Sequence, residues 1–198
     1  EAMQQYSELA NIYYQLAEFD MARQTYMAAS KLAQQAGADQ KWTLEILTKV
    51  ADIDMQRLDW KAAIKIYEQL RTMQPEAETP RARLIDLNLK LGNLPDAMAE
   101  LDGYVAILEN SNQRPKAIGF IKDLLQEHVT TPELYNRLAD LLIRHGQSAK
   151  AIEVLDAGGE ALLDAGNKQA AIDMIKKIIS LNPPNLADFQ NALRKLQL

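Results

Sequence analysis

The sequence predicts an all-α protein, and two observations lead to this prediction. Apolar residues recur at spacings of three and four along nearly all 198 residues, and no strand-like alternation interrupts them. An alanine that follows a turn also recurs, each time with a large apolar residue four positions later on the same helix face. Repetition of such a unit is typical of a solenoid, here of about eleven antiparallel helices. The alanines are Ala22, Ala63, Ala97, Ala117, Ala151 and Ala171.

Turn signals separate the helices in the first half of the chain. Asp20 and Asp59 are of the residue types that cap backbone N–H groups where a helix begins. Gly37 and Gly92 allow the left-handed conformation that follows a helix end, and Pro75 stops the helix before it. The first five helices are therefore predicted over residues 3–16, 19–35, 42–57, 60–73 and 79–91.

The second half follows the same rules. The helices predicted over 95–109, 115–128 and 132–145 each begin with a proline, which suits a turn where no N–H is needed. Ser148 is a candidate cap, and Gly146 and Gly166 end helices. The remaining helices are predicted over residues 148–164, 167–181 and 185–196. The last of them has an apolar stripe and a polar opposite face, so we expect it to close the array.

Three segments resemble the tetratricopeptide repeat, a helix–turn–helix of about 34 residues. Residues 3–36 and 132–165 carry its pattern of bulky residues, small residues and rings, and residues 44–77 carry it more loosely. Residues 78–111 carry part of the pattern, but Arg81 stands where a bulky residue is usual. The resemblance implies a right-handed α-solenoid whose paired helices leave a concave groove that binds a protein or peptide. It also places five tyrosines in the core: Tyr6, Tyr13, Tyr26, Tyr67 and Tyr135.

The spacing of the alanines departs from this family. The last four intervals alternate between a longer and a shorter step, so that Ala97 and Ala117 recur as Ala151 and Ala171. This recurrence defines a repeat period of about 54 residues, which spans three helices. We expect one solenoid over residues 1–198, with units of roughly 1–36, 37–77, 78–131 and 132–184 and a closing helix at 185–198. Because Glu1 already lies in a helical pattern, we also expect the chain to be part of a longer protein.

Composition and motifs disfavour several classes of protein. The net charge of −5 argues against binding to a nucleic-acid backbone, and no apolar run is long enough to cross a membrane. There is no cysteine, and two histidines without suitably spaced ligands do not indicate a metal site. Phosphate-binding loops and catalytic motifs are absent from the sequence. We expect no cofactor, no catalysis and a cytoplasmic location.

The predicted groove residues are polar. By helical phase they include Asn11, Tyr14, Asp52, Asp86 and Asp140. In chaperone-tail binders of the resembled family, Lys and Asn hold a terminal carboxylate at such positions, whereas aspartates recur here. This disfavours an acidic peptide and favours a partner with apolar anchors and some positive charge.

One polar face occurs twice, one repeat period apart. Arg83, Asp86 and Lys90 share a helix face, and the second copy consists of Arg137, Asp140 and Arg144. The two sets are interpreted either as solvated ridges with local ion pairs or as two equivalent contact sites.

The sequence thus predicts a non-catalytic scaffold that binds a protein or peptide. The alternative is a regulatory, sensor or self-association domain of a larger signalling or transcription-regulating protein. Homo-oligomers are compatible with both.

Overall fold

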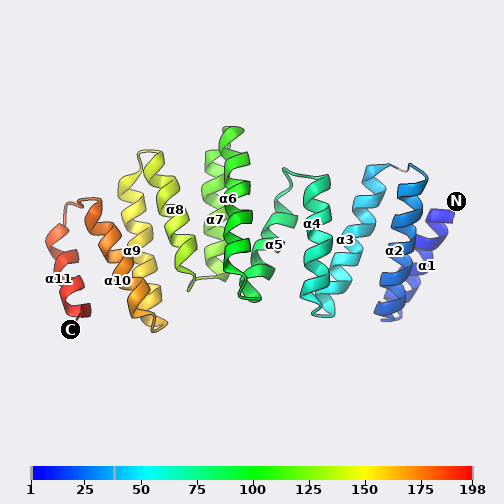
Figure 1. Ribbon diagram of the computed structural model, residues 1–198, viewed down its shortest axis with the longest axis horizontal. Helices are drawn as coiled ribbons and strands as arrows, with labels where there is room; N and C mark the ends of the chain where they lie inside the picture. Colours follow the sequence, from blue (N-terminus) through cyan, green and yellow to red (C-terminus); the bar gives the residue numbers. More distant parts are fainter. Residues whose placement is uncertain (1, 38, 198) are drawn as a thin grey trace. The chain divides into compact units, whose positions relative to one another are not determined.

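The computed structural model describes residues 2–37 and 39–197, and this part of the chain forms eleven α-helices and no strand (Figure 1). The predicted all-α class is confirmed, and every predicted helix end lies within two residues of the observed one. The helices are α1 (Ala2–Gln15), α2 (Phe19–Gln35), α3 (Gln40–Gln56), α4 (Trp60–Met73), α5 (Glu78–Lys90), α6 (Leu94–Asn110), α7 (Arg114–Glu127), α8 (Pro132–Arg144), α9 (Ser148–Asp164), α10 (Lys168–Ser180) and α11 (Leu186–Gln197). Among these residues, no helix combines the length and apolarity needed to cross a bilayer.

The turn before each recurring alanine contains one residue in the left-handed region. Glycine holds this position three times, as predicted, at Gly92, Gly146 and Gly166. Ala17, Leu58 and Asn112 hold it at the other turns, with φ of 59°, 56° and 57°. Each of the six lies five residues before its alanine, so one turn geometry recurs even where the sequence offers no glycine.

Two of the three predicted caps are wrong. The Asp59 carboxylate does accept a hydrogen bond from the Ala62 N–H, at 3.1 Å. Helix α2 instead begins after Glu18, and Asp20 lies in its first turn. Helix α9 begins at Ser148, so that Gln147 is the cap residue and Ser148 is already helical. A negative charge in the first turn interacts favourably with the helix dipole, which explains why an aspartate occurs near the start of α2.

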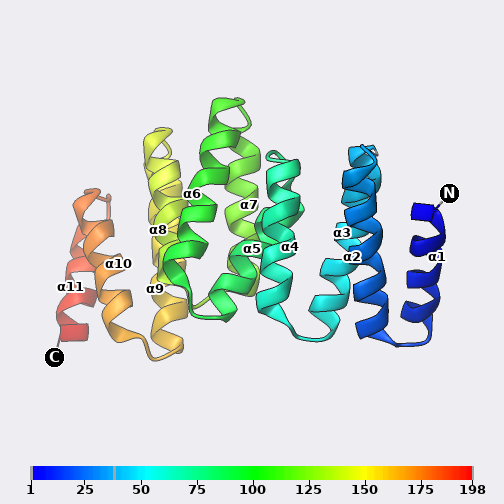
Figure 2. The same ribbon diagram turned by 45° about the vertical axis from the view of Figure 1, so that its right-hand side comes forward.

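Contacts between the helices fall into two compact units, Glu1–Tyr104 and Val105–Leu198, and the boundary lies within α6. In unit 1, α1 to α5 pack in sequence, each against the next, and in unit 2, α7 to α11 do the same. Short turns make successive helices antiparallel (Figure 2). The expected single solenoid stays a prediction.

The recurring alanines pack in the core, because all six side chains are fully buried. Tyr26, Tyr67 and Tyr135 are buried too, and Tyr13 is partly buried, as predicted. The placement of Tyr6 in the core is wrong, because 41% of this residue is exposed. Helix α1 packs mainly against α2, and Tyr6, Leu9 and Ile12 of α1 stay exposed in unit 1.

Candidate functional site

In unit 1, the predicted residues of α1 are bonded to α3. The Asn11 Oδ1 accepts hydrogen bonds from the Tyr26 hydroxyl at 2.5 Å and from the Lys49 Nζ at 2.8 Å. One turn further along α1, the Tyr14 hydroxyl accepts a hydrogen bond from the Gln56 Nε2 at 2.5 Å. Two side chains of α3 thus fix the polar face of α1.

The same surface continues from α3 to α5. Desolvation raises the pKa of the Asp52 carboxyl, and the positive charges of Arg83 and Lys49 partly offset this effect. Burial raises the pKa of Tyr67, whereas Arg83 lowers it by its charge and a hydrogen bond. Arg83 therefore lies between α3, α4 and its own helix α5. Asn11, Tyr14, Asp52 and Arg83 form one connected surface, here called the α1–α3–α5 surface.

Asp86 and Lys90 form a pair along α5. The Lys90 Nζ donates a hydrogen bond to the Asp86 carboxylate at 2.8 Å, and the Asp86 side chain is buried while that of Lys90 is largely exposed. Asp86 therefore offers little surface to a partner, and its charge holds the lysine of the next helical turn.

The corresponding residues of unit 2 make different contacts. Asp140 pairs with Lys177 of α10 at 2.7 Å, whereas Asp86 pairs within its own helix. Arg144 lies 3.3 Å from the Glu109 carboxylate, to which His145 is also bound, and Arg137 is partly buried. The two equivalent aspartates therefore bind lysines on different helices, Lys90 on α5 and Lys177 on α10.

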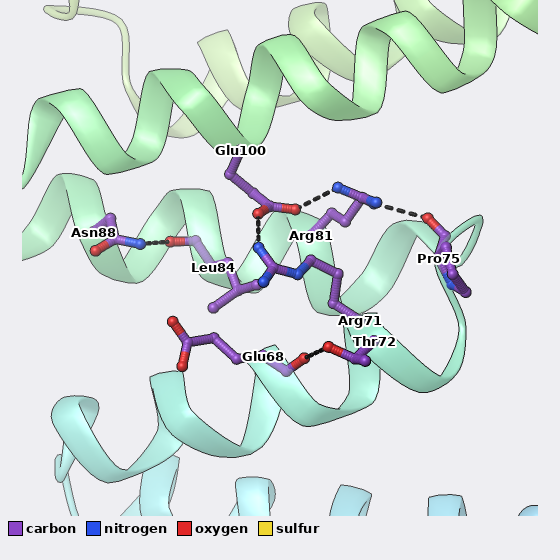
Figure 3. A network of polar contacts seen from close by, with 8 residues as sticks. All are labelled: Glu68, Arg71, Thr72, Pro75, Arg81, Leu84, Asn88 and Glu100. Carbon is purple, nitrogen blue, oxygen red and sulfur yellow. Dashed lines mark hydrogen bonds and ion pairs between the residues drawn. The ribbon is translucent and has the colours of Figure 1, made fainter.

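A buried ionic cluster in unit 1 did not emerge from the sequence (Figure 3). The Glu100 carboxylate of α6 accepts hydrogen bonds from Arg71 of α4 and, at 2.6 Å, from Arg81 of α5. Arg81 also donates from Nε to the Pro75 carbonyl at 2.9 Å, and its guanidinium lies 5.4 Å from the centre of the Tyr104 ring. Arg81 and Glu100 are both more than nine-tenths buried, so their pairing offsets part of the cost of burying two charges.

Unit 2 fills the same repeat positions without charge. Tyr135 is the counterpart of Arg81 one repeat period later, and its hydroxyl donates to the Val129 carbonyl at 3.1 Å, just as Arg81 donates to Pro75. The Tyr135 ring packs against Gly158, which is in turn the counterpart of Tyr104. The only sequence signal for the cluster was Arg81, at a position that a bulky residue usually holds. The repeat pattern did not mark its partners Arg71 and Glu100.

Beside this cluster, α4, α5 and α6 enclose an open cleft of about 610 Å³. Lys61, Lys65 and Arg71 line the α4 side, and Asp96 and Glu100 line the α6 side. The buried cluster thus reaches solvent at Arg71, which is about one-third exposed.

Paired antiparallel helices, with a left-handed turn before a buried alanine, define the chain as a helical repeat protein. Residues 6–35 and 55–117 match models of the tetratricopeptide repeat family. The chain therefore contains tetratricopeptide repeats, and proteins built from such repeats are generally protein-interaction scaffolds without catalytic activity.

Several solved structures are similar to the chain. A tetratricopeptide repeat protein from Parabacteroides merdae is 17% identical, with 99% of this chain and 84% of that one covered and a TM-score of 0.41. BtubC from P. vanneervenii is 16% identical over 90% and 79%, with a TM-score of 0.49. A tetratricopeptide repeat protein from Thermus thermophilus is 16% identical over 98% of each chain, with a TM-score of 0.36. At these values nothing about partners follows. No curated protein matches the chain significantly.

Proposed function

We propose that the chain is a non-catalytic scaffold that binds a protein or peptide along a groove whose contact residues in unit 1 are those of the α1–α3–α5 surface. The observation that carries the proposal is the connection of three helices by polar side chains around a desolvated carboxyl, Asp52. Lys49 and Arg83 leave this surface mixed in charge, and Tyr14 adds a partly exposed ring. Such a surface suits a partner with apolar anchors and some positive charge.

The remaining predicted residues extend the proposal. Lys90 adds an exposed cation that Asp86 holds in place. In unit 2, Arg137, Asp140 and Arg144 are proposed as a second contact region, because Asp140 and Arg144 remain about half exposed despite their ion pairs. A cytoplasmic location belongs to the same proposal and is tested by cell fractionation.

A binding experiment with matched variants tests the scaffold function. Proteins retained from a lysate of the source cell by the immobilised chain are compared with those retained by Tyr14→Ala/Asp52→Arg. Loss of a central tyrosine typically weakens an interface by about 1–3 kcal/mol, so a true partner is depleted from the double variant. Gln69→Ala, on the exposed part of α4, is the control. A protein that the double variant retains as well as the native chain does, and that binds the purified native chain directly, would contradict the proposed surface.

A second candidate, self-association, rests on the exposed face of α1. Leu9 and Ile12 are 42% and 52% exposed, although α2 packs on α1. At the repeat position of Ile12, the residues of α3, α5 and α8 are fully buried: Ile53, Leu87 and Leu141. Each of these three helices packs against the helix that precedes it in sequence. We infer that the exposed face of α1 is suited to packing against another helix.

Light scattering tests self-association through this face. If a second copy covers it, the mass of the chain rises with concentration, and Ile12→Lys abolishes the rise without lowering the melting temperature at low concentration. Val129→Lys, at an exposed apolar residue of unit 2, is the control. A constant mass over the whole concentration range excludes this candidate.

A further inference from the structure

An apolar cleft of about 480 Å³ lies between α9, α10 and α11 of unit 2. Its apolar lining comes from all three helices, with Leu163 of α9, Ile175 of α10 and Phe189 and Leu196 of α11. The volume falls within the range of about 300–1,000 Å³ that is usual for small-ligand sites. None of these residues belongs to the predicted contact regions.

The cleft has a cause in the sequence of α11. Leu84 and Leu87 of α5, and Leu138 and Leu141 of α8, are buried at equivalent repeat positions. One repeat period after the α8 pair, α11 has Ala192 and Lys195, and both line the cleft. A methyl group and a long polar chain replace two leucines, so α11 leaves unfilled the space that the leucines fill elsewhere.

Helix α9 contributes to the same hollow. Gly159 lines the cleft, and a Cβ atom placed on it would meet no other atom within 4 Å. At its neighbour Gly158, by contrast, an added Cβ would lie only 2.7 Å from the Tyr135 ring. Only one of the two glycines thus serves close helix packing, and the other leaves open space.

The rim of the cleft is acidic. Asp156 and Glu160 of α9 lie one helical turn apart, Asp188 belongs to α11, and Lys195 is the only basic residue among those that line it. Three carboxylates and one ammonium give this rim a net charge of −2, which attracts a cation beside an apolar group.

We propose that this α9–α11 cleft binds a large apolar side chain of a peptide whose neighbouring residues are lysine or arginine. The apolar side chain fills the space above Phe189 and Ile175, and the cationic neighbours face Asp156, Glu160 and Asp188. The inference rests on the proposed function, that the chain binds a peptide, and it assigns the apolar anchor to a surface other than the α1–α3–α5 surface.

The test uses the whole chain and the acetylated peptide Gly-Lys-Phe-Leu-Arg-Gly. Two reference peptides replace Phe-Leu by Ser-Ser, or Lys and Arg by Glu. The chain has eight glycines, so the Gly159 amide is readily followed in a proton–nitrogen NMR spectrum during titration. We expect the basic apolar peptide to shift this signal and to bind at least about tenfold more tightly than either reference peptide.

Filling the cleft separates binding from folding. Ala192→Leu restores the leucine of α5 and α8, so we expect the melting temperature to rise or hold and peptide affinity to fall about tenfold or more. Glu160→Gln should weaken binding severalfold and reduce its dependence on salt, whereas Glu153→Gln, an exposed carboxylate of α9 outside the cleft, should not.

Several results would overturn the inference. They are absence of peptide binding, equal binding of the reference peptides, or unchanged affinity in a folded Ala192→Leu variant. The double variant Tyr14→Ala/Asp52→Arg of unit 1 should bind the peptide normally. Suppose that the double variant loses a cellular partner while the native chain does not bind the peptide. Peptide binding in the α9–α11 cleft would then be refuted, and the proposed scaffold function would stand.

Discussion

Gly158 and Gly159 are neighbours on α9 with opposite roles. Close helix packing accounts for Gly158 alone, because a Cβ added there would lie 2.7 Å from the Tyr135 ring and 2.8 Å from the Met174 sulfur. Gly159 borders open space. Successive residues of a helix are rotated by about 100° around its axis, so the two glycines face different neighbours.

Substituting each glycine by alanine should therefore change stability in opposite directions. Gly158→Ala adds a methyl group to a filled space, and overpacking of about 1–3 kcal/mol should exceed the gain in helix propensity. Gly159→Ala should raise the free energy of unfolding by about 0.5–1 kcal/mol. Urea denaturation followed by circular dichroism measures both. Equal effects of the two substitutions would contradict this assignment.

The raised pKa of Asp52 predicts how stability depends on pH. Because the folded-state pKa lies above the unfolded value of about 3.9, this group favours folding below that value, and the contribution is lost as pH rises through the folded pKa. The ionised carboxylate thus costs stability at neutral pH. Asp52→Asn should make the chain more stable at pH 7, and the advantage should shrink as pH falls and the Asp52 carboxyl of the parent chain becomes protonated. Urea denaturation of both chains at pH 7 and at acidic pH measures the difference in the free energy of unfolding. A variant less stable than the parent at pH 7 would show that the attraction of Asp52 by Arg83 and Lys49 outweighs its desolvation.

At the scale of helices, one junction is built in two ways. Where α4, α5 and α6 meet, the positions 71, 81, 100 and 104 hold two arginines, a glutamate and a tyrosine. At the equivalent positions of α7, α8 and α9, which are 125, 135, 154 and 158, the chain has leucine, tyrosine, valine and glycine. In both arrangements a side chain donates a hydrogen bond to the loop carbonyl at the equivalent repeat position, which is Pro75 in unit 1 and Val129 in unit 2. In the second, the tyrosine side chain comes from the other helix, and the residue facing it shrinks to glycine.

Removing one member of the ionic junction should cost more than replacing it whole. Glu100→Ala leaves the buried Arg81 guanidinium without its carboxylate, so we expect a loss of about 3 kcal/mol in the free energy of unfolding. The variant Arg71→Leu/Arg81→Tyr/Glu100→Val/Tyr104→Gly copies unit 2 and should recover most of this loss. Thermal and urea unfolding compare the two variants. A fourfold variant less stable than Glu100→Ala would show that the junctions are not interchangeable.

Across the whole molecule, the sequence predicted what depends on local pattern. Helix type and ends followed from apolar spacing, prolines and glycines, and the buried alanines followed from their repetition. The ionic cluster was not predicted, because Arg71, Arg81 and Glu100 lie on three helices and their pairing depends on tertiary packing. Tyr6 was misplaced for a related reason, because its burial depends on which faces of α1 other helices cover, and 41% of this residue is exposed.

The division into two units predicts where a local defect is felt. In each unit the helices pack mainly against their neighbours in sequence, and stability in such repeat proteins is close to a sum of repeat and nearest-neighbour terms. Gly158→Ala should therefore speed amide hydrogen exchange most in α8, α9 and α10, while α2 and α3 keep their protection. Glu100→Ala should show the reverse pattern, with faster exchange in α4 and α5. Mass spectrometry of peptic fragments resolves these helices, and Gly159→Ala serves as the control. A uniform loss of protection along the chain in either variant would mean that both units unfold as one cooperative structure.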